Sequence, residues 1–116
     1  MSSVLVIGYD PEALPGNDAK AINEAFDKEL ARFAERGVDV DSAVVVFDEK
    51  AEPTLVAAPT RRPWDVVVVG GGIRKAEPLL QLFERILNLT RRHAPQAAIA
   101  FNTGVGDTLE SAERWL

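Results

Sequence analysis

The chain contains no cysteine and only one histidine among its 116 residues. The missing thiols exclude disulfides, cysteine nucleophiles and thiolate metal sites, and a single histidine argues against a histidine-based zinc site. Basic residues are outnumbered, with 13 Lys and Arg against 18 Asp and Glu and a formal net charge of −5. Because nucleic acids and anionic membranes are bound through clustered basic residues, neither is expected as a main partner.

Long apolar runs are also missing. The first residues carry no positive region, their apolar run is too short for a signal peptide, and no stretch approaches the length of a membrane span. Hydrophobic residues still make up 47% of the chain and charged residues 27%, as in an average soluble protein. A chain of this length fits one domain with a real core. We therefore expect a single cytoplasmic domain over residues 1–116.

The chain does contain apolar, β-branched runs that alternate with helical patterns. Strand-like runs cover residues 4–9, 38–47, 65–69 and 97–101, and helical patterns cover 19–35, 76–93 and the segment after 107. This alternation predicts an α/β fold with right-handed crossovers. The expected architecture is a small doubly wound sheet of four parallel strands in the order 2-1-3-4. Helices on both faces would complete a three-layer, flavodoxin-like or Rossmann-like domain.

Three local features refine the prediction. Asn17 or Asp18 is expected to cap the helix over 19–35, and the pattern Asp107-Thr108-Leu109-Glu110 predicts a capping box for the last helix. Segment 51–63 holds three prolines, so we expect no full helix there, only one or two turns around 54–58.

The most informative stretch runs from Trp64 to Arg74, with four valines followed directly by three glycines. A continuous β-branched run is typical of a strand buried on both faces. The backbone donors of Gly70–Gly72, together with Arg74, can hold a phosphate or carboxylate. The alternative is structural: the glycines only allow a tight turn, and Arg74 pairs with Asp10 or Glu77.

Ligands of doubly wound sheets bind at the carboxyl ends of the strands, where the strand order reverses. Here that point lies between the first and third strands, and the loop after the fourth strand lies along the same edge. The predicted ligand-binding residues on these loops are Gly70, Gly71, Gly72, Arg74, Asn102 and Thr103. Tyr9 and Asp10 are the nearby candidates for proton transfer. Asn102 and Thr103 can equally hold the loop backbone through local hydrogen bonds, and Asp107 is better explained as a cap than as a catalyst.

The helix predicted over 77–93 supports a second hypothesis about the function of the protein. Its apolar stripe is wide, with Leu80 and Leu87 flanking the main face, which suits either burial or a homodimer interface. His93 should lie at its far end, at the edge of the sheet opposite Arg74. Arg91, Arg92 and His93 form a basic cluster at this helix end, which is explained by the favourable interaction of positive charge with the carboxyl end of the helix dipole. The rival hypothesis is therefore a non-enzymatic homodimeric interaction module.

Known cofactor motifs are missing. The dinucleotide fingerprint and the Walker A loop are both absent, as is the flavodoxin phosphate loop, so no cofactor is expected. Asp10, Asp48 and Asp107 are scattered over three loops, so no metal site is expected either. The sequence predicts binding of a small anionic molecule and assigns no reaction.

The second half of the chain also resembles an uncharacterised family of small bacterial α/β proteins. The resemblance is carried by Val69-Gly70-x-Gly72-Ile73-Arg74, Leu82-Phe83-Glu84 with Asn88, His93-Ala94-Pro95, Phe101-Asn102-Thr103, Asp107-Thr108 and Arg114-Trp115. It implies a Rossmann-like or flavodoxin-like fold and no established activity.

Overall fold

The structure is a computed structural model that describes residues 2–13, 16 and 18–116. Of the two cap candidates for the first long helix, Asn17 lies outside the described residues. Asp18 is observed in the cap role, since its carboxylate accepts the Ala21 N–H at 3.1 Å. The helix ends before Gly37, whose φ of 69° is the left-handed conformation that glycine adopts without strain.

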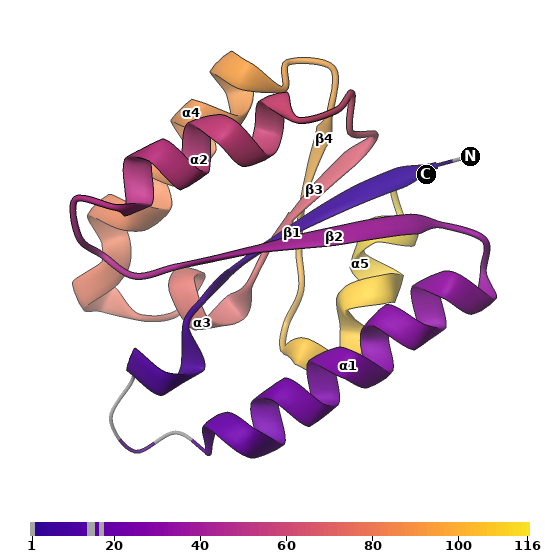
Figure 1. Ribbon diagram of the computed structural model, residues 1–116, viewed down its shortest axis with the longest axis horizontal. Coiled ribbons are helices and arrows are strands. Elements are labelled where there is room, and N and C mark those ends of the chain that lie inside the picture. The colour runs from indigo at the N-terminus through magenta and orange to yellow at the C-terminus, as the bar shows by residue number, and fades with distance from the viewer. Residues whose placement is uncertain (1, 14–15, 17) are drawn as a thin grey trace.

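Four parallel strands form one sheet in the order β2-β1-β3-β4, as predicted from the alternating pattern (Figure 1). The strands are β1 (Ser3–Tyr9), β2 (Asp39–Val45), β3 (Val66–Val69) and β4 (Ala98–Phe101). The four valines of β3 are fully buried because this strand lies between β1 and β4 and is covered on both faces. Val4 of β1 pairs with Val66 of β3, so the two central strands come from distant parts of the chain.

Helices cover both faces of the sheet (Figure 1). α1 (Ala19–Glu35) and α5 (Thr108–Glu113) lie on one face, over a core that includes Val6, Phe33 and Leu109. α2 (Ala51–Thr60) and α4 (Leu80–His93) lie on the other. The predicted three-layer arrangement is confirmed.

The expectation for residues 51–63 was wrong, because α2 is a ten-residue helix. Pro53 falls in the first turn, where a backbone N–H has no partner within the helix, and Pro59 falls in the last turn. Leu55, Ala58 and Pro59 are buried on the inward side of α2. The fully buried Trp64 adds a bond from its indole N–H to the Ala58 carbonyl at 2.9 Å. Burial and this cap outweigh the unfavourable proline.

Two further segments differ in detail from the predicted elements. Residues 71–74 form a single helical turn, α3 (Gly71–Arg74), directly after β3. Pro78 lies in a short 3-10 turn (Glu77–Leu79) that leads into α4, which suits its missing N–H. Within the part of the chain that the structure describes, no helix combines the length and apolar character needed to cross a bilayer.

Replacing Trp64 with phenylalanine should lower the free energy of unfolding by about 1–3 kcal/mol, because the Ala58 carbonyl loses its indole donor and a small void is left. Urea denaturation followed by far-UV circular dichroism measures this. Trp115 is 58% exposed and provides the matched control. Trp115→Phe should change the unfolding free energy by less than about 0.5 kcal/mol. Equal effects of the two substitutions would contradict a role for Trp64 in holding α2.

Candidate functional site

The side chain of Asn102 joins the loops at the carboxyl edge of the sheet. Asn102 follows β4 and is only 4% exposed. Its Oδ1 accepts the backbone N–H of Gly71 at 2.8 Å, and its Nδ2 donates to the hydroxyl of Thr108 at 3.0 Å. One buried amide therefore ties the turn after β3 to the start of α5. The loops after β3 and β4, which the sequence predicts at one edge of the sheet, are therefore in contact.

Arg74 also contributes to this arrangement. Its Nη2 donates to the backbone carbonyl of Asn102 at 2.8 Å. Its Nε is buried and has no hydrogen-bond partner among the described residues. Neither Asp10 nor Glu77 is paired with Arg74 in that part of the chain. The guanidinium is thus turned toward the main chain of the neighbouring loop.

The glycine donors are mostly occupied. Gly70 N–H donates to the Ile7 carbonyl at 2.9 Å, and Gly71 N–H is taken by Asn102. Among the three, only the Gly72 N–H has no partner within the described chain. A Cβ at Gly71 would lie 3.4 Å from the Thr103 carbonyl oxygen, so the two loops approach each other to van der Waals distance at this position.

Asp107 holds the loop after β4 rather than the helix that follows it. Its carboxylate accepts the Thr103 N–H at 2.9 Å, the Thr103 hydroxyl at 2.8 Å and the Gly104 N–H at 3.3 Å. Partial burial alone would raise the pKa of Asp107, but these hydrogen bonds outweigh it and hold the pKa below its usual range. The predicted capping box for α5 was wrong, because the Asp107 side chain makes no hydrogen bond into α5.

A buried carboxylate from α1 takes over that cap. Glu29 is 3% exposed, and its Oε1 accepts the Leu109 N–H of α5 at 3.0 Å. Its Oε2 pairs with Arg32 at 2.8 Å, and Arg32 in turn pairs with Glu110. The Arg32 hydrogen bond lowers the pKa of Glu110. This network fixes the second half of α1 against α5, and sequence reasoning missed it because the residues are about 80 positions apart.

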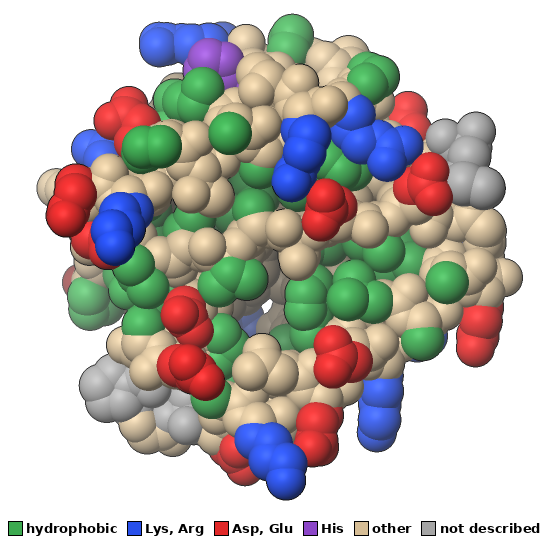
Figure 2. Space-filling view, viewed as in Figure 1, with side chains coloured by type: hydrophobic (Ala, Val, Ile, Leu, Met, Phe, Trp, Pro, Cys, Tyr) green, Lys and Arg blue, Asp and Glu red, His purple; other side chains and the backbone are tan. Residues whose placement is uncertain are grey.

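A cleft of about 510 Å³ opens between the first turns of α1 and the sheet and reaches the carboxyl edge. Figure 2 shows the molecule hollowed between α1 and β2, with apolar side chains around the opening. The described residues that line it come from β1, β2, α1 and the three loops. They are Val6, Gly8, Tyr9, Pro11, Ile22, Asn23, Phe26, Ser42, Val44, Gly70–Gly72, Lys75, Ala76, Asn102–Val105 and Thr108.

All but one of the predicted ligand-binding residues line the cleft. Gly70, Gly71, Gly72, Asn102 and Thr103 line the cleft. Arg74 lies beside it, and Lys75 is the cation that lines it, with its Nζ donating to the Thr103 carbonyl. Which of two adjacent basic residues faces the cleft depends on the orientation of the single turn α3, and no sequence signal distinguishes them.

The candidates for proton transfer have other contacts. Tyr9 lines the cleft, and its hydroxyl accepts the Phe47 N–H at 3.4 Å. Asp10 is not a lining residue, and its carboxylate accepts the Glu12 N–H at 3.0 Å in a local turn. The described lining contains no Asp, Glu or His, so it offers no paired acid and base.

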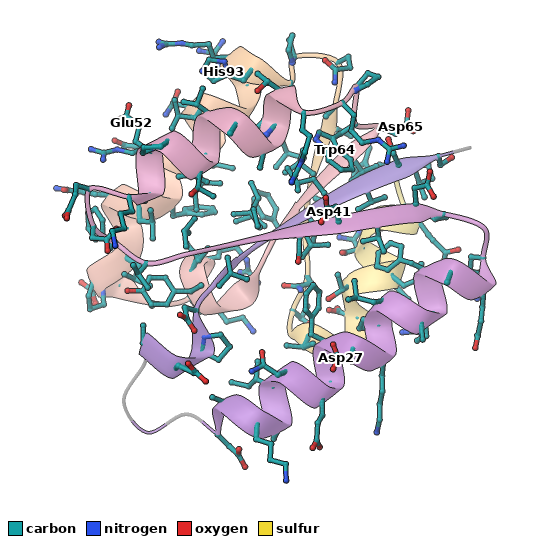
Figure 3. The ribbon with its side chains drawn as sticks, viewed as in Figure 1. Asp27, Asp41, Glu52, Trp64, Asp65 and His93 are labelled. Carbon is teal, nitrogen blue, oxygen red and sulfur yellow. The ribbon has the colours of Figure 1, made fainter. Side chains whose placement is uncertain are left out.

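His93 ends α4, next to the amino end of β4 and far from the cleft (Figure 3). This placement agrees with the prediction that it lies at the opposite edge from Arg74. Over residues 2–13, 16 and 18–116, no cluster of three or more His, Asp and Glu side chains is arranged to hold a metal ion.

The chain matches no family model, and no curated protein shows significant similarity to it.

Asn102→Ala should lower the free energy of unfolding by about 2–4 kcal/mol, because it leaves the buried Gly71 N–H without an acceptor and removes the amide donor to the Thr108 hydroxyl. Chemical denaturation measures the loss. Asn88 is the control: it is exposed on α4 and its amide donates to the Glu84 carbonyl of the same helix. Asn88→Ala should be nearly neutral. A loss below about 1 kcal/mol at Asn102 would contradict its role in joining the loops.

Asp107 should make the loop after β4 sensitive to acid. Its folded-state pKa is lowered, so the carboxylate stabilises the fold above the ordinary Asp pKa of about 4, and that contribution is lost as the pH falls through the lowered value. Asp107→Asn should therefore melt below the wild type at pH 7, with the difference in Tm shrinking between about pH 5 and pH 2. A difference that stays constant over this range would show that the carboxylate charge is not involved.

Proposed function

We propose that this protein binds a small anionic molecule in the cleft at the carboxyl edge of its sheet. The observation that carries the proposal is the position of the cleft. It reaches the point between β1 and β3 where the strand order reverses, and its volume of about 510 Å³ is typical of small-molecule sites.

Each part of the edge has a role in this proposal. Lys75 supplies the positive charge, and the Gly72 N–H supplies a backbone donor next to it. Asn102, Arg74 and Thr103 act mainly by holding the loops in place, so the site would be formed before the ligand arrives. No reaction is proposed, because the described residues of the lining include no acid–base pair.

The homodimeric interaction module is the second candidate, and one observation favours it. Leu80 on α4 is 61% exposed and Phe101 on the edge strand β4 is 36% exposed. Phe101 also packs against Phe83 of α4, with ring centroids 5.9 Å apart. Apolar side chains at an open sheet edge favour an interface.

Asn23→Trp should abolish binding, because Asn23 is an exposed α1 residue that lines the cleft and an indole there would fill it. Wild type and variant are compared in a thermal-shift screen against inorganic phosphate, nucleotides, sugar phosphates and carboxylates. A ligand at about 100 times its Kd stabilises a fold by roughly 2.7 kcal/mol, which raises Tm measurably. Glu24→Trp, one position away, exposed and outside the lining, should bind as the wild type does.

Two outcomes would contradict the proposal: no compound raises the Tm of the wild type, or the shift is the same in Asn23→Trp. Sedimentation of the same samples then tests the interaction module. A dimer that Leu80→Glu dissociates would favour the second candidate, whereas a monomer would exclude it.

A further inference from the structure

We infer that the cleft accepts an amphiphile with one negative charge, a carboxylate joined to an apolar body, rather than a phosphate ester. This inference rests on the proposed function and specifies the class of ligand for the same site. It follows from how α1 meets the sheet and from the distribution of charge in the lining.

α1 packs tightly along only half of its length. In its second half, Phe33 is fully buried and Glu29 is 3% exposed, fixed to α5. In its first half, the inward-facing Ile22 and Phe26 are only half-buried. Figure 1 shows the helix and β2 diverging toward the beginning of α1.

The facing strand is uncovered at the same place. Val44 of β2 is 51% exposed although it belongs to the sheet face that α1 covers, and it lines the cleft together with Val6. Phe26 still packs against the core cluster that includes Val6, but the apolar side chains of the helix and of the sheet that line the cleft keep part of their surface exposed. An apolar body between them would remove both surfaces from water, which favours binding.

Charge in the lining is confined to one end. Lys75 is the only charged side chain among the described residues that line the cleft, and it lies at the carboxyl edge. An ammonium group has three donors, and the Thr103 carbonyl takes one of them. The remaining donors suit a single carboxylate at the edge of a space whose lining is mostly apolar.

The same edge is poorly equipped for phosphate. Phosphate sites usually combine several backbone donors with an arginine fork or a lysine. Here Gly70 and Gly71 already donate within the protein, and Arg74 donates to the Asn102 carbonyl. Arg74 is also not among the described residues that line the cleft, so Lys75 is the cation available there and Gly72 carries the unpaired N–H of the three glycines. This set matches one negative charge better than two.

Isothermal titration with octanoate, 1-octanol, 2-naphthoate and inorganic phosphate tests this inference, each amphiphile being kept below its aggregation concentration. Octanoate should bind at least about tenfold more tightly than octanol, since a charge-assisted hydrogen bond contributes that much or more. Phosphate should show no binding at the same concentrations. Comparing octanoate with 2-naphthoate shows whether the apolar body is a chain or a ring system.

Lys75→Met is the decisive variant, because it keeps an unbranched apolar stem and removes the charge. It should reduce the octanoate preference over octanol to within about twofold. Lys28→Met, at an exposed α1 position outside the lining, should leave the preference unchanged. Equal binding of octanoate and octanol to the wild type, or a preference that survives in Lys75→Met, would overturn the inference.

Failure of the ligand class and failure of the site give different results. Phosphate or a phosphate ester that binds the wild type but not Asn23→Trp would show that the cleft is the site and that the amphiphile assignment is wrong. If no probe binds, or if binding is unaltered in Asn23→Trp, the cleft is not the site and both proposals fail.

Discussion

The carboxyl edge of this domain depends on one buried amide. The acceptor of Asn102 is used by Gly71 and its donor by Thr108, while its backbone carbonyl is held by Arg74. A buried amide with both ends satisfied has a single orientation, and a partly satisfied one is costly. The turn after β3, the loop after β4 and the start of α5 therefore share one reference point, and the polar rim of the cleft takes its shape from it.

Most of the fold was predictable from local patterns. The valine runs and their alternation with helical segments gave the four strands, their order and the two helical layers, because burial on both faces leaves a continuous apolar signature. The failure at 51–60 has a physical cause. Proline lowers helix propensity locally, but the helix is stabilised by Leu55 in the core and by the indole of Trp64, which follows it in the chain. Tertiary packing therefore stabilises a helix over residues 51–60 that helix propensity alone does not predict.

The site was predictable only as a region. Glycines and polar residues after parallel strands located the edge, and Gly70–Gly72, Asn102 and Thr103 do line the cleft. The walls were not visible in the sequence, because Ile22, Phe26 and Val44 read as ordinary core residues. Their partial exposure follows from the divergence of α1 and β2 toward the beginning of the helix, whereas the other half of α1 is held to α5 by the bond between Glu29 and Leu109. The orientation of a helix relative to a sheet cannot be predicted from the pattern of apolar residues alone.

The pairing of β1 with β3 also sets how this chain must fold. The two strands are brought together across 62 residues, as the bond from the Ser3 N–H to the Asp65 carboxylate illustrates. The entropy of closing such a loop is lost before any strand pairing offsets it, so formation of the sheet is intrinsically slower than that of a helical bundle of equal length. During synthesis, β1 has no central partner until β3 has left the ribosome. β2 and α1 come earlier in the chain and can cover the other edge and one face of β1. The edge of β1 that pairs with β3 stays open until then, and an open strand edge makes the incomplete chain prone to aggregate.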